Sequence, residues 1–209
     1  MPFSIEIEQD AATLVAELTK LLLDSVAQLS ATAFVTGSGS GEPTGFVTAL
    51  AAASPSVIVT GDGSEAIGDN DPYKLQNALP PRFQPNSRFV AALPTINTFR
   101  KSETTNGALK YPSLQNDPPT LLGRPIHEVS NMDSTLNAAA TEANYVLAVG
   151  DWSQYLVAVK LGTKVELVPH LFGSSRRPTG QRGFYAHFRI GADSLVDNAF
   201  RLLNVPTTA

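Results

Sequence analysis

Hydrophobic and polar positions alternate at the start of the chain and then switch to a helical period. Alternation over positions 3–8 predicts a short strand with one solvated face, and Asp10 after it can act as a helix N-cap. The helical period that follows predicts an amphipathic helix of about 20 residues, roughly 30 Å long, which needs a partner along most of its length. Its apolar residues recur at spacings of three and four, at Leu14, Val15, Leu18, Leu21, Leu22, Val26 and Leu29.

The middle and end of the chain predict short strands interleaved with two short helices. Asp71 before Pro72 predicts a helix start, with Tyr73, Leu75 and Leu79 on the buried face. A second helix starts at Pro94 and buries Ile96 and Phe99. Strands are predicted over residues 57–60, 88–93, 125–129, 145–149, 155–159, 164–168, 184–190 and 200–205.

Two glycine-rich segments predict flexible boundaries, at 37–45 and at 173–183. The first follows a strand-like run, Ala33-Phe34-Val35-Thr36. Between the two segments the pattern is mixed α/β. The flanks are expected to form a second module from the first strand, the long helix and two C-terminal strands, with 3–7 and 184–190 as candidates to share a sheet.

Composition excludes several kinds of functional site and disfavours some classes of protein. The 209 residues suffice for one large domain or two modest ones, and the absence of cysteine excludes disulfides, thiolate metal sites and cysteine nucleophiles. Charged residues make up only 16% of the chain, so its surface carries little electrostatic repulsion and can be covered by copies of itself. A net charge of −4 disfavours a dedicated nucleic-acid binder. No apolar run approaches the roughly 20 residues of a membrane span, and no secretory signal is present.

The segment Gly37–Gly45 is the one candidate nucleotide loop, since residues 39–45 satisfy G-x-G-x-x-x-G. Glu42 places an anion where phosphates would lie, Pro43 removes an amide donor, and no helical period follows at 45–53. No Walker motif occurs. A plain hinge is therefore favoured, and an α/β small-molecule enzyme using this loop remains the alternative from another class.

Other chemistry-bearing residues are favoured as structural. His127, His170 and His187 each lie alone, without a neighbouring ligand pair, and are expected to be partly buried or to lie at an interface. A Ser-His-Asp triad stays open, because its members are spread along a chain, although no G-x-S-x-G elbow is present. Asp151 at a strand exit is expected to cap a turn, and Trp152 to anchor packing.

Four arginines give local positive charge to an otherwise acidic chain. Arg176, Arg177 and Arg182 lie in the second glycine-rich segment, and Arg189 follows it. They are either solvated or used between subunits or near phosphate, and both interpretations stay open. A DNA-binding accessory protein using these arginines is a third hypothesis.

Four segments in order resemble the major capsid protein of tailed bacteriophages of the Hong Kong 97 type. Residues 33–45 are similar to the signature AF..G.G.G.P.G after the family's spine helix, and Leu75-Gln76-Asn77-Ala78-Leu79-Pro80 to the segment before a central strand. Residues 121–126 (LLGRPI), followed by Asn131-Met132-Asp133, are similar to its strand entry LLGRPV. Residues 149–155 (VGDWSQY) are similar to GDFS.Y.

The resemblance implies an α+β fold of the Hong Kong 97 type with two parts. A peripheral domain would contain residues 1–44, with a strand and the spine helix, and residues 179–209; a mixed α/β axial domain would contain residues 45–178. The implied function is a structural, non-enzymatic subunit of an icosahedral phage or prophage capsid shell, with no catalytic, cofactor or metal residues.

The resemblance also implies partners and a location. Copies of the chain would form pentamers and hexamers in the virion shell after synthesis in the bacterial cytoplasm. Scaffolding, protease and portal proteins of the same phage are candidate partners, packaged DNA is met only by non-specific proximity, and no membrane is involved. An encapsulin-like nanocompartment shell is the alternative within the same fold.

The chain departs from the family at its start. It begins almost at the spine helix, without the N-terminal arm and extended loop that clasp neighbouring subunits, so it resembles the C-terminal portion of a family member. We therefore expect no cross-link chemistry and impaired assembly. An engineered fragment, a proteolytic remnant and a degenerate gene all remain open as its origin.

Overall fold

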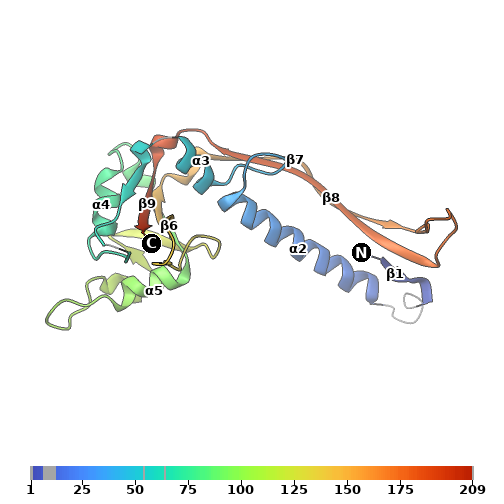
Figure 1. Ribbon diagram of the computed structural model, residues 1–209, viewed down its shortest axis with the longest axis horizontal. Coiled ribbons are helices and arrows are strands. Elements are labelled where there is room, and N and C mark those ends of the chain that lie inside the picture. Colours follow the sequence, from blue (N-terminus) through green and yellow to red (C-terminus); the bar gives the residue numbers. More distant parts are fainter. Residues whose placement is uncertain (1, 7–12, 54, 64, 209) are drawn as a thin grey trace. The chain divides into compact units, whose positions relative to one another are not determined.

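The computed structural model describes residues 2–6, 13–53, 55–63 and 65–208, which form two compact units (Figure 1). Unit 1 contains Met1–Thr32 and Val157–Gly191. Unit 2 contains Ala33–Leu156 and Ala192–Ala209.

Unit 1 is built on a three-stranded sheet of order β1-β8-β7. Strand β1 (Pro2–Ser4) pairs antiparallel with β8 (Gln181–Ser194), with Phe3 opposite Arg182. The Phe3 ring stacks on Phe184 at 5.3 Å between centroids. The expected shared sheet between the chain start and this late strand is thus confirmed. The first strand is shorter than predicted, because the backbone is helical at residues 5 and 6; residues 7 and 8 and the expected cap Asp10 lie outside the described residues.

Strand β7 (Tyr155–Val168) joins the two strands predicted at 155–159 and 164–168 into one, passing through Gly162. The segment 173–183, expected as a boundary between domains, instead contains the turn between β7 and β8. Its backbone is hydrogen-bonded across the turn, from Gly173 N–H to the Arg177 carbonyl (3.0 Å) and from Thr179 N–H to the Leu171 carbonyl (2.9 Å). Glycine and proline therefore allow the chain to reverse tightly within one hairpin, and the segment is not a hinge between domains.

The long helix α2 (Leu14–Thr36) extends the predicted helix by two turns and runs alongside the β7–β8 pair in Figure 1. Residues 33–36, expected as a strand-like run, form its last turn, which closes with Gly37 N–H donating to the Ala33 carbonyl at 2.9 Å. Adding residues to an existing helix is favourable even where aromatic and β-branched residues prefer strands. Burial of Val35 in the core favours the same outcome.

Helix α2 is also long and apolar enough to cross a membrane by length and composition, with a mean hydropathy of 1.2 over an 18-residue window. This corrects the expectation that no segment approaches a span. That expectation considered uninterrupted apolar runs, whereas charged and polar residues such as Lys20, Asp24 and Ser25 interrupt the run in α2 while the average over 18 residues stays at 1.2. Helices of proteins that never meet a membrane satisfy the same criterion, so it carries little weight.

Unit 2 contains a six-stranded mixed sheet of order β2-β9-β6-β3-β5-β4. The pairs β2–β9 and β3–β5 are parallel, whereas β9–β6, β6–β3 and β5–β4 are antiparallel. Phe89 lies between Val149 and Ile126 in this register, so three strands contribute to one apolar layer. The strands are β2 (Ile58–Thr60), β3 (Arg88–Ala91), β4 (Thr120–Leu121), β5 (Arg124–Glu128), β6 (Glu142–Gly150) and β9 (Phe200–Thr207).

Three helices accompany this sheet: α3 (Phe46–Ala53), α4 (Asp71–Ala78) and α5 (Leu93–Lys101). Helix α3 was not expected, because its apolar sequence FVTALAAA has no polar face to reveal a helical period, although alanine favours helix. Single 3-10 turns lie at Pro55–Val57, Gln84–Asn86, Pro112–Gln115, Trp152–Gln154 and Asp197–Ala199.

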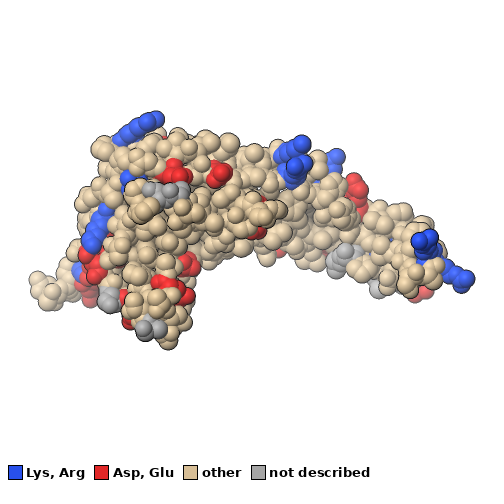
Figure 2. Space-filling model, turned by 45° about the horizontal axis from the view of Figure 1, so that its top comes forward, with Lys and Arg blue, Asp and Glu red and all other residues tan. Residues whose placement is uncertain are grey.

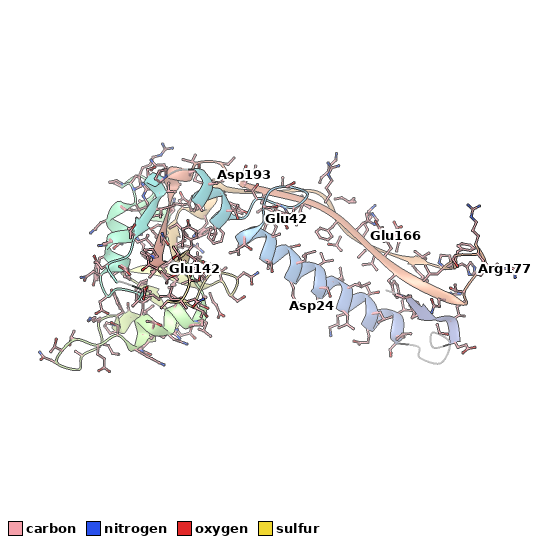
Figure 3. All side chains as sticks on the ribbon, viewed as in Figure 1. Asp24, Glu42, Glu142, Glu166, Arg177 and Asp193 are labelled. Atoms are coloured by element: carbon pink, nitrogen blue, oxygen red, sulfur yellow. The ribbon has the colours of Figure 1, made fainter. Side chains whose placement is uncertain are left out.

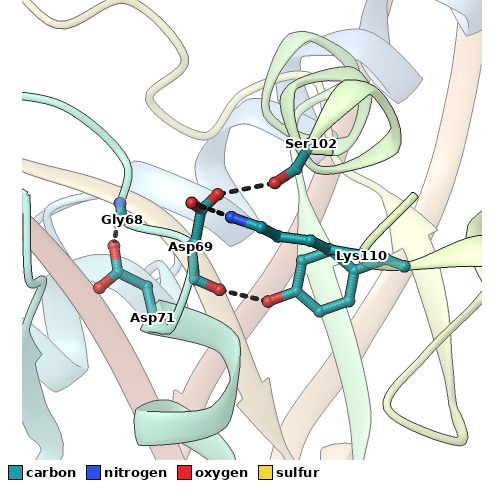
Figure 4. A network of polar contacts seen from close by, with 6 residues as sticks. Gly68, Asp69, Asp71, Ser102 and Lys110 are labelled. Atoms are coloured by element: carbon teal, nitrogen blue, oxygen red, sulfur yellow. Dashed lines mark hydrogen bonds and ion pairs between the residues drawn. The ribbon is translucent and has the colours of Figure 1, made fainter. Parts of the chain in front are cut away.

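The start of α4 differs from the prediction by one residue. Asn70 occupies the N-cap position and Asp71 is the first helical residue. The buried Asp71 carboxylate accepts from the amides of Gly68 (2.6 Å) and Asp62 (2.7 Å) and so closes the loop before the helix (Figure 4). Leu75 and Leu79 are buried as expected, but Tyr73 is not: it is 47% exposed.

The two compact units divide the chain at other places than the expected domains do. Strand β9 was expected with the flanking module, yet it lies in unit 2 between β2 and β6, where Phe200, Leu202, Leu203 and Val205 are all buried. Conversely, most of β7 was expected in the middle domain and belongs to unit 1. A strand whose two faces are both apolar needs to be covered on both faces. In the centre of the unit 2 sheet, β9 is covered in this way.

Candidate subunit interface

The hydrophobic core lies in unit 2. The clustered buried side chains run from Val35 to Val205, and all belong to this unit. Among the described residues of unit 1, only Leu18 and Phe184 are buried large apolar side chains, each 7% exposed. Unit 1 therefore has almost no core of its own.

Large apolar side chains of unit 1 are exposed to an unusual degree. On α2, Leu21 and Leu29 are 58% and 61% exposed; on β7, Val159 is 62% exposed; and Phe172 in the turn is 65% exposed. The same holds for Leu23, Val157, Leu167 and Tyr185. Clustered exposure of this kind marks surfaces that other molecules cover.

Strand β7 adds a backbone feature to this surface. It lies at the edge of its sheet, with β8 on one side and no described strand on the other. An edge of 14 residues offers a long row of amide and carbonyl groups for pairing with another chain. Sequence reasoning missed this surface, although one signal was present: residues 155–168 place apolar residues on both faces of the strand, more than a small sheet can bury.

The glycine-rich segment 37–45 forms a closed turn between α2 and α3. The Glu42 carboxylate accepts from the Ser38 amide and hydroxyl, each at 2.8 Å, and these bonds lower the pKa of Glu42. The amides of Gly45 and Thr44 donate to the carbonyls of Gly37 and Ala192. With these donors engaged inside the protein, the loop does not present the amide cradle that a nucleotide phosphate requires.

Tyr155 fastens this turn to the start of β7. Its hydroxyl donates to the Thr44 carbonyl (2.7 Å) and lies 3.2 Å from the Phe34 carbonyl. Burial raises the pKa of Tyr155 to about 12, so the hydroxyl keeps its proton at neutral pH and remains a donor.

Asp151 and Trp152 take the structural roles expected of them. Asp151 Oδ1 accepts from the Ser153 amide (3.1 Å) and caps the short turn that follows. The Trp152 indole N–H donates to the Arg88 carbonyl (3.1 Å), and its ring meets Phe46 and Phe200 edge-on at 5.0 and 5.3 Å between centroids. Trp152 is therefore a packing anchor between segments distant in the sequence.

An open cavity of about 590 Å³ in unit 2 brings several singled-out residues together, which the sequence did not reveal. Its lining includes Arg88, Arg124, His127, Asp151 and Ser153. A catalytic triad needs serine bonded to histidine and histidine to aspartate. Here the Ser153 hydroxyl donates directly to Asp151 Oδ1 (2.8 Å), and His127 has no hydrogen bond to either among the described residues. These three residues are therefore not arranged as a triad.

The three histidines do not converge. His127 is exposed in the cavity, His170 is exposed beyond the end of β7, and His187 is partly buried on β8 against Tyr185, with 5.6 Å between ring centroids. Within the described ranges, no group of three histidine, aspartate or glutamate residues could hold a metal ion.

A polar network around Asp69 stabilises the loop after α5 (Figure 4). Asp69 pairs with Lys110, accepts from the Ser102 hydroxyl (2.6 Å), and through its carbonyl accepts from the Tyr111 hydroxyl. The bonds from Lys110 and Ser102 lower the pKa of Asp69, while burial raises the pKa of Tyr111 to about 12. The network joins three loops of unit 2. Its two charged groups, Asp69 and Lys110, are paired with each other.

Comparison with known proteins decides between a shell subunit and the alternatives. The model of the phage capsid family matches residues 1–205. The chain belongs to the phage capsid family. It is therefore a structural subunit of a capsid shell and is located in the virion shell. No curated protein gives a significant match.

Solved structures agree with this membership in the phage capsid family. The capsid of a native GTA particle, computed with C5 symmetry, is 25% identical with a TM-score of 0.83; the match covers 100% of this chain and 71% of that chain. The capsid of an empty GTA particle is 23% identical over 100% of this chain and 70% of that chain, with a TM-score of 0.81. These and other phage capsid structures confirm the Hong Kong 97-type α+β fold.

More distant matches show the fold alone. A structure from Mycobacterium phage Ogopogo is 16% identical over 98% of this chain and 73% of that chain, with a TM-score of 0.64. The SrpI encapsulin complex from Synechococcus elongatus PCC 7942 is 12% identical over 98% of this chain and 71% of that chain, with a TM-score of 0.67. Because the family match is to phage capsids, an encapsulin-like shell is not favoured.

Proposed function

We propose that copies of this chain form pentamers and hexamers that close an icosahedral shell around DNA. The observation that carries the proposal is the near absence of a core in unit 1, combined with apolar side chains that are more than half exposed on α2, β7 and the turn after it. Such a unit gains most of its stability by being covered, and other copies are the partner that a capsid subunit always has. Weak individual contacts suffice, because many copies act together.

The two units have different places in this proposal. Unit 2, residues 33–156 with 192–209, is the axial domain that converges at the five-fold and six-fold positions. Unit 1, residues 1–32 with 157–191, is the peripheral domain that meets neighbouring copies around the rim. What supports this assignment is the location of the core: a self-sufficient domain suits the centre of a capsomer, and a thin sheet with one helix suits overlapping contacts.

The wider partners follow from the same role. Scaffolding, protease and portal proteins of the same phage would act on the shell during its formation. Packaged DNA would be met without specific binding, because a net charge of −4 gives no general attraction for phosphate. Low charge also allows copies to approach closely, and most of the face in Figure 2 is uncharged.

Electron microscopy and light scattering on the purified chain test the proposal. We expect pentameric and hexameric rings or closed shells whose amount rises steeply with protein concentration. A three-dimensional reconstruction should place unit 2 at the symmetry axes. A chain that stays monomeric at every concentration and salt condition contradicts self-assembly, and a map with unit 1 at the axes contradicts the domain assignment alone.

A further inference from the structure

Positive charge is concentrated in one segment of the chain. Residues 157–191 contain one acidic residue, Glu166, and six basic ones: Lys160, Lys164, Arg176, Arg177, Arg182 and Arg189. The segment therefore carries +5, and because the whole chain carries −4, the remainder carries −9. This segment is the part of the β7–β8 hairpin that belongs to unit 1.

Five of these six basic side chains form no ion pair with the described acidic residues. The two ion pairs found among the described residues, Lys74–Asp62 and Lys110–Asp69, both lie in unit 2. Lys160, Lys164, Arg176, Arg177 and Arg189 are exposed, and none of them pairs with a described acidic residue. Their charge is available to a partner.

Two of these basic residues, Arg176 and Arg177, lie in the turn of the hairpin, whose backbone is closed by hydrogen bonds. Arg176 has a left-handed backbone (φ 60°), and its amide donates to the Gly173 carbonyl at 2.9 Å. The isolated bridge between Phe172 and Pro178 closes the turn. Figure 3 shows Arg177 at the outer end of the hairpin, directed away from it. A non-glycine residue in this conformation carries a strain cost, and the hydrogen-bonded turn around it holds the tip in shape.

An aromatic residue accompanies the two arginines. Phe172 is the most exposed of the large apolar side chains described, at 65%. An exposed phenylalanine beside two arginines has the composition of an interface hot spot, in which the aromatic ring anchors and the guanidinium groups select an acidic partner. Double-stranded DNA would offer phosphate to the arginines, but its bases remain stacked inside the duplex and give the ring no apolar surface, so a protein partner fits this tip better.

We propose that the hairpin tip, formed by Phe172, Arg176 and Arg177, docks on an acidic surface of a second copy of this chain. The inference rests on the proposed self-assembly and names the surface that directs it. The partner is assigned by charge complementarity, since each copy offers a basic hairpin of +5 and a remainder of −9. Opposite charges would steer copies together and set their orientation, while Phe172 provides the buried contact.

Charge reversal with a matched control tests the proposal. We expect Arg176→Glu with Arg177→Glu to lower the yield of assembled particles at least tenfold in light scattering at low salt. Added salt should weaken assembly of the unsubstituted chain but affect the variant less, because salt screens attraction in the former only. The control, Arg82→Glu with Lys101→Glu, makes the same change in net charge at exposed positions of unit 2 and should retain assembly.

The outcomes separate this inference from the function on which it rests. If the unsubstituted chain forms no particles, the proposed function fails. If it assembles and the tip variant assembles equally well, or if the control loses assembly to the same extent, only the docking proposal is overturned. Unchanged circular dichroism and thermal unfolding of the tip variant confirm that it folds.

Photo-crosslinking identifies the partner directly. A photoreactive benzoylphenylalanine in place of Phe172 should form covalent dimers in assembled particles, and mass spectrometry should locate the cross-link beside acidic residues of the second copy. Cross-linking to packaged DNA, or to no molecule at all, would overturn the proposal.

Discussion

Unit 2 and unit 1 are parts of one chain but are stabilised in different ways. Unit 2 buries a continuous set of apolar side chains in and around a six-stranded sheet, including Phe89, Phe99 and Phe200, each at most 2% exposed. Unit 1 buries only Leu18 and Phe184 among its described large apolar residues, while Val159 and Leu29 remain more than 60% exposed. Hydrophobic residues therefore have two roles in this protein. In unit 2 they form the core of the fold, and in unit 1 they provide surface for contacts between copies.

The comparison also bears on where the chain carries its charges. Burial of apolar surface contributes about 25 cal/mol per Å² within a fold, and association with another copy gains less per area because it also loses translational and rotational freedom. A charge on a surface that another copy covers has to be desolvated or paired, so the position of each charge matters. Within unit 1 the positive charges are concentrated on the hairpin, with six basic residues and one acidic residue, whereas residues 1–32 contain five acidic residues and one basic residue. This separation of charge suits orientation more than solubility.

The largest effect is expected from a core truncation in unit 2. Leu203→Ala removes a side chain that is fully buried on β9 between β2 and β6. The lost burial and the resulting cavity should lower the free energy of unfolding by about 2–5 kcal/mol, measured by urea denaturation. A loss below about 1 kcal/mol would mean that β9 is not a central strand.

A substitution at an exposed apolar position of unit 1 should weaken assembly and leave the stability of the free chain almost unchanged. Val159→Thr keeps the shape and strand preference of an exposed β7 residue but adds a hydroxyl group. We expect the free energy of unfolding of the unassembled chain to change by less than about 0.5 kcal/mol. The protein concentration needed for assembly should rise about tenfold, equivalent to about 1.4 kcal/mol per subunit added. Destabilisation of the free chain, with assembly unchanged, would contradict the contrast between the units.

Tyr155→Phe tests the attachment of the glycine-rich turn. The substitution removes the donor to the Thr44 carbonyl and should cost about 1 kcal/mol of unfolding free energy. The unsubstituted protein should also lose stability as the pH rises from about 10 to about 12, because the pKa of Tyr155 is raised to about 12 in the folded state and the unfolded chain ionises first. Stability curves against pH, compared for the two proteins, measure both effects. The variant should lose part of this alkaline decline and retain the part due to Tyr111, whose pKa is also raised to about 12.

The smallest effect is expected at the ion pair between Lys110 and Asp69. Lys110→Gln removes a partly exposed pair, so unfolding free energy should fall by less than about 1 kcal/mol, and less in high salt. The bond from Lys110 lowers the pKa of Asp69, so its contribution is present at neutral pH and is lost as the pH falls through the folded pKa. Urea denaturation at neutral and acidic pH should show the difference between the two proteins disappearing in acid.

The sequence predicts elements of this protein better than it predicts their neighbours. The helical period from Leu14 and the proline-marked starts of α4 and α5 follow from local patterns and are present in the structure. The pairing of β1 with β8 is also present, but the alternation of the two segments only made it a candidate. The strand at 200–205 is also present, but its place between β2 and β6 depends on non-local pairing, which no local pattern reveals. Helix α3 was missed because a segment whose one polar residue is Thr48 has no period to detect.

The interface surface was partly predictable. The arginines of the turn were singled out by their glycine and proline context, which indicates exposure. The exposed apolar residues were not, because sequence patterns treat Val159 and Leu29 as core by default; only the fold shows that unit 1 has nothing to cover them. The cavity beside His127 and Asp151 was also beyond prediction, since its lining comes from several separate segments.

Hydrogen exchange measured on free subunits and on assembled shells tests the central claim most directly, that unit 1 is stabilised chiefly by other copies. We expect amides of residues 157–191 to exchange rapidly in the free subunit and to become strongly protected in the shell, while β6 and β9 of unit 2 are protected in both. Equal and high protection of residues 157–191 in free subunits and shells would contradict the account.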